Sequence, residues 1–193
     1  MIRIALPEDV PQILEVYAPY IMTSTATFEY DVPCKKDFLQ RFLKITAQFP
    51  WLVWEENEKI LGYAYASAPF ERPAYAWCAE PSVYLRPEAA RRGIGSKLYQ
   101  ALEQILKYQG YQVLYALITS ENFPSVRFHE KNGYVQISAF SNCGYKFSRW
   151  LGVIWMEKRL NFVESPRAFP TAWMSIVQNA EKITDILDNL SLS

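Results

Sequence analysis

The segment between residues 82 and 118 constrains the fold most, because a strand, a glycine turn, a helix and a second strand follow one another there. The strand SVYL is closed by Arg86-Pro87, and Ile94–Gln109 then repeats apolar residues three and four apart, which indicates an amphipathic helix. Gly110 can end that helix, and the apolar run Val113–Ile118 is typical of a buried strand. This order predicts a βαβ unit, so part of the sheet should be parallel.

Apolar spacing and turn residues predict further strands and helices on both sides of this unit. We expect strands at Ile2–Ala5, Trp51–Glu55, Ile60–Ala68, Tyr75–Leu85, Tyr134–Ser141 and Trp150–Leu160, and helices from Val10 to about Tyr20, at Lys35–Gln48 and at Pro124–Lys131. The resulting order βααβββαβαββ predicts one α/β (α+β) domain over residues 1–160. Residues 161–193 should form a linker and one amphipathic helix, packed on the domain or on a partner subunit.

Composition excludes several classes of protein. The 20 basic and 20 acidic residues cancel, which argues against a nucleic-acid partner bound through bulk charge. A single histidine, His129, excludes metal sites that need two histidines, and we expect no metal. Three scattered cysteines without a CxxC motif indicate reduced thiols, and no apolar stretch approaches the roughly 18 residues of a membrane span. We therefore expect a cytoplasmic protein with no membrane partner.

The turn Arg91-Arg92-Gly93-Ile94-Gly95 comes directly before the helix and has the features of an anion site. Glycines let the backbone turn tightly, and the first helical turn presents unpaired N–H groups that suit a pyrophosphate. The P-loop pattern GxxxxGK[ST] is absent, and GxGxxG fails because Leu98 stands at the third glycine position. The alternative is a turn that merely connects a strand to a helix.

Several motifs resemble the GNAT acyltransferases. RRGIGS after SVYL is similar to the acetyl-CoA motif of that family, and ENFPSVRFHEKNGY (Glu121–Tyr134) is similar to its N-x-x-S-x-x-x-[YH]-E-K-x-G-[FY] pattern. STATF, GYAYA, PFERPAYAW, AEPSVY and GYKFSRW resemble the phosphinothricin and methionine sulfoximine acetyltransferase branch. The resemblance covers about Ile2 to Leu160. One departure is Ala90, where the family has glutamine or arginine; we expect only a modest effect, because backbone N–H groups hold the phosphates.

The resemblance implies a GNAT fold, with a mixed, mostly antiparallel sheet of about six or seven strands and a central, splayed parallel pair flanked by helices. It implies transfer of an acetyl group from acetyl-CoA to the primary amine of an amino-acid-like small molecule, by direct attack in a ternary complex. Two alternatives are an acetyltransferase for another amine or a protein N-terminus, and a non-catalytic acyl-CoA-binding module. A homodimer is also implied.

The resemblance assigns the cofactor to three groups of residues. The backbone of Val83, Tyr84 and Leu85 would pair with the pantetheine arm like an added strand, and the Leu85 N–H could polarise the thioester carbonyl. The turn should hold the pyrophosphate, and two further residues match family positions near the cofactor. These residues are Arg91, Arg92, Gly93, Ile94, Gly95 and Ser96 in the turn, and Asn122 and Ser125 beyond it.

Three residues are candidates for proton transfer. Glu80 is the candidate base that takes a proton from the substrate ammonium, because alternation places it on one face with Tyr84 unless Pro81 forms a bulge. Apolar neighbours could raise its pKa, and the alternative is an edge-strand glutamate in a salt bridge. His129 matches the family position that bears a tyrosine or histidine, and the sequence leaves open whether it is an acid, a base or a binding group. Tyr84 is a further candidate acid.

The acceptor pocket is inferred from the family alone. Phe28, Arg72 and Tyr75 match family substrate positions, together with Glu80 and Tyr84. Arg72 could bind a carboxylate or phosphinate with two parallel hydrogen bonds, while Phe28 and Tyr75 would form walls. The alternative is core packing for the aromatic residues and a solvated surface charge for Arg72.

Overall fold

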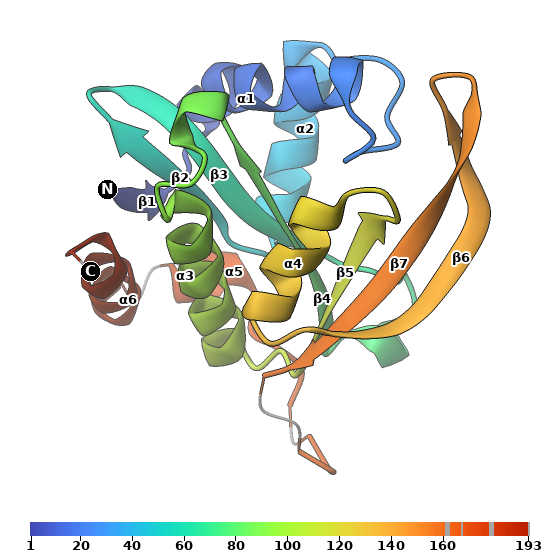
Figure 1. The fold of residues 1–193 in the computed structure, drawn as a ribbon. Helices are drawn as coiled ribbons and strands as arrows, with labels where there is room; N and C mark the ends of the chain where they lie inside the picture. Colours follow the sequence, from blue (N-terminus) through green and yellow to red (C-terminus); the bar gives the residue numbers. More distant parts are fainter. Residues whose placement is uncertain (161–162, 167, 178–179, 193) are drawn as a thin grey trace.

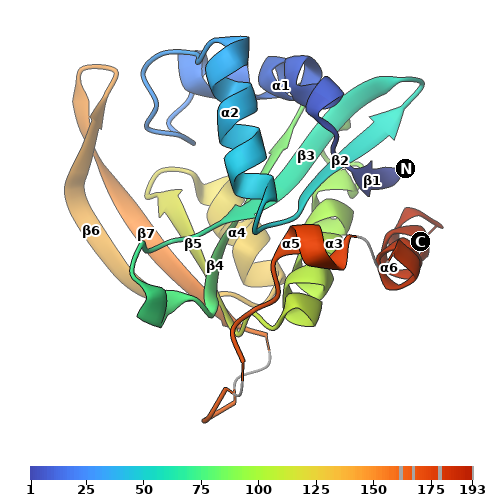
Figure 2. The same cartoon turned by 180° about the vertical axis from the view of Figure 1, so that it is seen from behind.

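A single seven-stranded sheet forms the centre of the molecule, with helices against it (Figures 1 and 2). The computed structural model describes residues 1–160, 163–166, 168–177 and 180–192. The strands are β1 (Ile2–Ile4), β2 (Trp51–Glu56), β3 (Lys59–Ser67), β4 (Cys78–Leu85), β5 (Val113–Thr119), β6 (Val135–Lys146) and β7 (Arg149–Arg159). The helices are α1 (Val10–Thr23), α2 (Lys35–Thr46), α3 (Ile94–Gln109), α4 (Phe123–Lys131), α5 (Trp173–Ile176) and α6 (Ala180–Leu192).

The strands lie in the order β1-β2-β3-β4-β5-β7-β6. The paired strands are antiparallel except β4 and β5, which are parallel. The expected sheet with a central parallel pair is confirmed. In the described chain, β4 and β5 pair at Cys78 with Val113 and at Ala79 with Leu114. Beyond those residues the two strands diverge toward their carboxyl ends, which leaves one edge of β4 without a neighbouring strand.

The sheet separates two hydrophobic cores, and side-chain alternation along β2 assigns residues to each. Trp51 and Val53 pack with α1 and α2, whereas Leu52 and Trp54 pack with α3. Helix α4 lies beside β5. No helix among the residues described above is long and apolar enough to cross a lipid bilayer.

Several boundaries differ from the sequence expectation, and β6 differs most, because it continues past Ser141 to Lys146. The strand expected from Tyr75 begins at Cys78, and Pro73–Tyr75 form a 3₁₀ turn before it. Pro73 favours this turn, because its fixed φ suits a first helical position. Helix α1 continues past Tyr20 to Thr23 although it contains Pro19.

The tail after β7 packs on the same core as the rest of the sheet. Two helices, α5 and α6, stand where the sequence predicts one. Trp173 of α5 is buried, and α6 lies against α3 and β1, where the Ile2 N–H donates to Ser191 Oγ at 3.0 Å. The segment before α5 lies near the start of β4, since Trp77 Nε1 donates to the Ala168 carbonyl at 3.0 Å and the Trp77 ring stacks on Phe169.

Candidate active site

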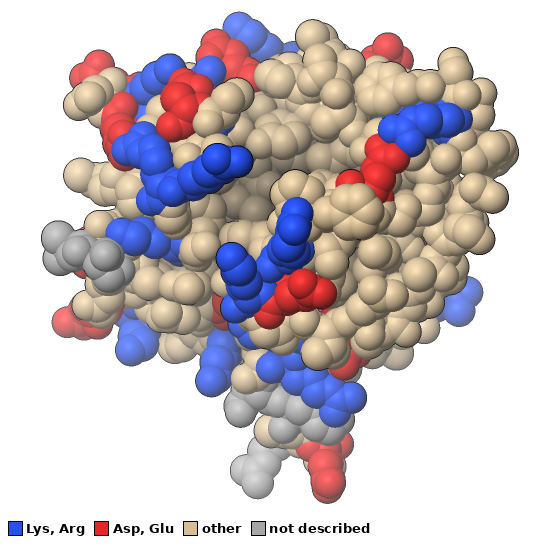
Figure 3. Space-filling model, viewed as in Figure 1, with Lys and Arg blue, Asp and Glu red and all other residues tan. Residues whose placement is uncertain are grey.

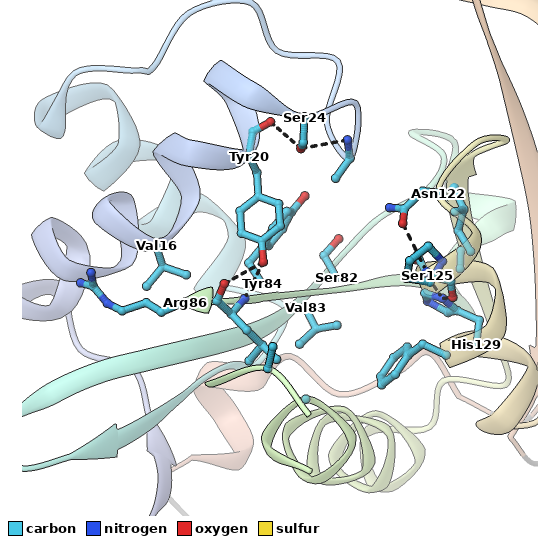
Figure 4. Close-up of a pocket in the computed structure, with 18 of the residues that line it drawn as sticks. Val16, Tyr20, Ser24, Ser82, Val83, Tyr84, Arg86, Asn122, Ser125 and His129 are labelled. Atoms are coloured by element: carbon cyan, nitrogen blue, oxygen red, sulfur yellow. Dashed lines mark hydrogen bonds between the residues drawn. The ribbon is translucent and has the colours of Figure 1, made fainter. Parts of the chain in front are cut away.

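A cavity of about 1000 Å³ opens where β4 and β5 diverge. Its walls come from β4, β5, the end of α1 and the first turns of α3 and α4 (Figure 4). Arginine and lysine side chains border the hollow on the face shown in Figure 3. Arg91, Arg127 and Lys131 line the cavity and suit a ligand that carries several negative charges. Arg86 lies on the same wall but pairs with Glu15 at 2.8 Å, and Glu80 and Glu88 also line the cavity.

The glycine turn forms one end of this cavity through Arg91, Gly93, Gly95 and Ser96. Gly93 has a φ of 79° and precedes α3 without any side-chain cap, so the first N–H groups of the helix remain available to an anion. A side chain at Gly95 would press on Leu85, since its Cβ would lie 3.2 Å from Leu85 Cδ1. The glycines therefore let the turn approach the end of β4 closely.

Two other residues of the turn point elsewhere. The Arg92 guanidinium lies 2.7 and 2.9 Å from the two carboxylate oxygens of Glu56, and Ile94 is buried in the core. Neither residue lines the cavity, so only their backbone groups could face a ligand. Sequence reasoning instead missed Arg86, Arg127 and Lys131, which stand outside the glycine motif.

Glu80 faces the cavity from β4. The antiparallel register with β3 is regular from Ser67–Glu80 to Tyr63–Tyr84, so Pro81 introduces no bulge and Glu80 shares a face with Tyr84. Burial raises the pKa of Glu80 from its ordinary 4.5 to about 7. A carboxyl group with this pKa can accept a proton and release it again near neutral pH.

Tyr84 lies in an aromatic cluster under α1. Its ring makes edge contacts with Tyr17 at 4.9 Å and Tyr20 at 5.0 Å between ring centroids, and the Tyr63 ring lies 5.4 Å away. Burial raises the pKa of the Tyr84 hydroxyl well above 10, so this hydroxyl stays protonated at neutral pH.

His129 is buried in α4 with both ring nitrogens hydrogen-bonded. Nδ1 lies 2.8 Å from the Ser125 carbonyl oxygen, which only accepts, so Nδ1 carries the proton. Nε2 lies 3.0 Å from the Tyr99 hydroxyl and accepts from it when the ring is neutral. Burial lowers the pKa of His129 below its ordinary 6.5. In this arrangement both ring nitrogens are used within the protein.

We therefore expect nitrogen NMR spectra at pH 7 to show His129 as the neutral tautomer with a proton on Nδ1. The ring should become charged only below pH 6.5, because the charged form loses hydration on burial. Replacing Tyr99 by phenylalanine should change the Nε2 chemical shift, because it removes the donor to that atom. A ring that is already charged at pH 7 would contradict this assignment.

Asn122 and Ser125 both line the cavity at the start of α4. Asn122 caps this helix, since its side-chain oxygen accepts from the Ser125 N–H at 3.3 Å. The two residues that the sequence places near the cofactor thus lie opposite β4, across the gap between the diverging strands (Figure 4).

Of the candidate acceptor residues, Glu80 and Tyr84 line the large cavity, whereas Phe28, Arg72 and Tyr75 lie outside it. The Phe28 ring packs on Gly144 of β6, and a side chain at Gly144 would overlap it. Arg72 and Tyr75 are exposed, and the Tyr75 ring packs on Phe70 at 4.6 Å between centroids. The structure therefore brings Glu80 and Tyr84 together with the glycine turn, but it does not place Phe28, Arg72 or Tyr75 in the wall of that cavity.

A comparison with protein families decides the class. The profile of the acetyltransferase (GNAT) domain matches residues 2–155. The chain belongs to the GNAT acetyltransferase family. The GNAT fold, the acetyltransferase class and the relation to the phosphinothricin branch, all expected from the sequence, are confirmed.

Individual relatives of this GNAT chain agree with the profile. It is 35% identical to phosphinothricin N-acetyltransferase of Alcaligenes faecalis over 164 residues, covering 83% of this chain and 82% of the relative. It is 32% identical to L-methionine sulfoximine/L-methionine sulfone acetyltransferase of Pseudomonas aeruginosa over 165 residues, covering 83% of this chain and 94% of the relative. A phosphinothricin acetyltransferase from Sinorhizobium meliloti, solved in complex with AcCoA, superposes on this chain with a TM-score of 0.81 at 32% identity. The superposition covers 89% of this chain and 92% of that chain.

Proposed function

We propose that this protein binds acetyl-CoA in the large cavity and transfers the acetyl group to the primary amine of an amino-acid-like small molecule. Glu80 carries the proposal, because it combines a cavity position with a pKa of about 7, as a base for an ammonium substrate requires. A protein that only bound an acyl-CoA would need no such group.

The residues of the cavity fit acetyl-CoA. The uncapped first turn of α3, with Arg91 beside it, suits the pyrophosphate. The edge of β4 at Val83 and Leu85, with which β5 does not pair, suits the amides of the pantetheine arm. Bound acetyl-CoA would supply the activated acetyl group. Solved relatives that hold acetyl-CoA support the assignment, including yncA of Salmonella typhimurium, with a TM-score of 0.83 at 28% identity, covering 87% of this chain and 98% of that chain.

Three side chains have roles in the proposed reaction. Glu80 accepts the proton of the ammonium, so that the amine gains the lone pair it needs for attack. The Tyr84 hydroxyl stays protonated and donates a hydrogen bond to the leaving thiolate, which stabilises its negative charge. His129 acts as a positioning residue, because its hydrogen bond to Tyr99 joins α4 to α3 beside the cofactor site, while Nδ1 bonds the Ser125 carbonyl within α4.

We assign the acceptor to the class of phosphinothricin, methionine sulfoximine and methionine sulfone, because relatives with these names cover more than four fifths of the chain. Phe28, Arg72 and Tyr75 would contact it, and Arg72 suits its anionic group.

The test is release of CoA from acetyl-CoA in the presence of a panel of amines. The panel holds the three compounds above, ordinary amino acids, a polyamine and a peptide, and detection must avoid thiol reagents because the chain has three cysteines. We expect saturable turnover with the first three compounds. Acetyl-CoA binding without turnover on any amine would instead indicate a binding module.

We also propose a homodimer in the cytoplasm, with the catalytic domain at 1–160. The hairpin of β6 and β7 extends away from the helices (Figure 1) and exposes aromatic rings, including Trp150 at 61% exposure. We expect Trp150→Glu to shift the protein from dimer to monomer in sedimentation velocity. Tyr108→Glu, which alters another exposed aromatic residue, on α3 at 46% exposure, should leave the dimer intact. A monomeric wild type would overturn the dimer.

The proposed location in the cytoplasm rests on the cysteines. Cys34, Cys78 and Cys143 are free thiols, which suit a reducing compartment.

A further inference from the structure

The last turns of α1 place the Tyr20 hydroxyl against the end of β4. This hydroxyl donates to the Leu85 carbonyl oxygen at 2.7 Å and accepts from the Leu85 N–H at 3.2 Å (Figure 4). Tyr20 and Leu85 are 65 positions apart in the sequence, and no single sequence motif contains both. One side chain thus satisfies both backbone groups of Leu85.

These backbone groups belong to the unpaired edge of β4. The next residue, Arg86, donates its N–H to the Leu61 carbonyl of β3 at 2.7 Å. Because consecutive residues of a strand direct their backbone groups to opposite sides, the groups of Leu85 point away from β3. They point into the gap that β5 leaves where the parallel pair diverges.

A single hydroxyl that both donates and accepts offers the same pairing as a secondary amide. The pantetheine arm of acetyl-CoA carries two secondary amides, and such an arm pairs with an unpaired strand edge through its N–H and C=O groups. We propose that the Tyr20 hydroxyl is a placeholder that caps the edge of β4 at Leu85 until the pantetheine arm of acetyl-CoA displaces it. This inference rests on the proposed function, since it requires acetyl-CoA in the cavity.

The surroundings of Tyr20 permit this displacement. Its ring lies between the large cavity and a second cavity of about 370 Å³, and it lines both. The backbone of the turn is held separately, because Ser24 Oγ donates to the Tyr20 carbonyl and Thr23 Oγ1 donates to the Pro19 carbonyl, each at 2.8 Å. Rotation of the side chain can therefore free Leu85 without unwinding α1.

The test compares wild type, Tyr20→Phe and Tyr17→Phe by calorimetric titration. Acetyl-CoA should bind Tyr20→Phe about five-fold more tightly than wild type, because its arm no longer competes with a hydroxyl worth about one net hydrogen bond. Adenosine 3′,5′-bisphosphate, which lacks the arm, should bind both proteins equally. Tyr17→Phe also loses a buried hydroxyl, but that hydroxyl bonds the side chains of Thr27, Glu29 and Tyr84 and not the backbone of Leu85, so its affinity for acetyl-CoA should not change.

Amide hydrogen exchange gives a second readout that does not depend on turnover. In the empty protein the Leu85 amide should exchange faster in Tyr20→Phe than in wild type, and acetyl-CoA should slow it equally in both. Equal or weaker acetyl-CoA binding by Tyr20→Phe, with unchanged exchange at Leu85, would overturn the placeholder. Failure of the wild type to bind acetyl-CoA would overturn the proposed function itself.

Discussion

Glu80→Gln should lower kcat about a hundred-fold to a thousand-fold and leave the Kd for acetyl-CoA unchanged. Glutamine keeps the size of the side chain but cannot take a proton from the substrate ammonium, and general base catalysis contributes effects of about this size. Steady-state kinetics with a saturating amine and titration with acetyl-CoA measure the two quantities. Glu130→Gln, at an exposed position of α4, is the matched control and should keep full activity. Wild-type activity in Glu80→Gln would remove Glu80 from the mechanism.

The pH dependence of the wild type should report the same group. Because the pKa of Glu80 is about 7, kcat/KM should rise with pH through 7, and this inflection should vanish in Glu80→Gln.

The free energy of unfolding should show the opposite trend with pH. Between pH 4.5 and about 7 the folded protein holds a proton on Glu80 that the unfolded chain has lost, so the free energy of unfolding contributed by this group falls as pH rises.

Glu80→Gln should therefore be more stable than wild type above pH 7 and equally stable below pH 4.5. Urea unfolding at both pH values measures the difference. A gain in stability that accompanies the loss of activity would identify the buried carboxyl group as a functional feature that costs stability. Equal stability at both pH values would show that Glu80 keeps an ordinary pKa in the folded protein.

Trp173→Ala has the largest expected effect on stability, about 3–5 kcal/mol of the free energy of unfolding. Trp173 is 2% exposed in the core shared with α3, although it lies beyond the residues that the family profile matches. Truncation of the indole leaves a cavity in this core. It also removes the packing that holds the backbone N–H of residue 173 against the Gln48 carbonyl, to which it donates at 3.0 Å.

The neighbouring methionine offers a matched control for this substitution. Met174 is 53% exposed, so Met174→Ala should change the free energy of unfolding by less than about 0.5 kcal/mol. Both variants are compared with wild type by urea unfolding at one pH. Similar small effects from the two substitutions would mean that the tail is only loosely attached to the domain.

Local sequence patterns predicted the elements that carry local signals. The bounds of α3, Ile94–Gln109, agree with the expectation, because a regular apolar period runs from the glycine turn to Gly110. The parallel pair also follows from local order, since a helix must connect strands that run in the same direction. The side of β4 that carries Glu80 was predictable from alternation once Pro81 was found to make no bulge.

Contacts between distant residues were not predictable in the same way. Arg92 was expected at the phosphates, but its guanidinium binds Glu56, 36 residues earlier in the chain. Tyr20 was read only as the end of an amphipathic helix, and its contact with Leu85 depends on how α1 lies across β4. The placement of Phe28, Arg72 and Tyr75 outside the large cavity likewise depends on loop conformations that no periodic pattern determines.

The contact between β1 and α6 has a consequence for synthesis on the ribosome. Ile2 and Ser191 are 189 positions apart in the sequence, yet the Ile2 N–H donates to Ser191 Oγ. Residues 183, 186 and 187 of α6 are buried against the same core as α3. A nascent chain that lacks them exposes an apolar strip of α3, so this domain should reach its native packing only after α6 has been translated, and chains terminated before α6 should be targets for chaperones and proteases.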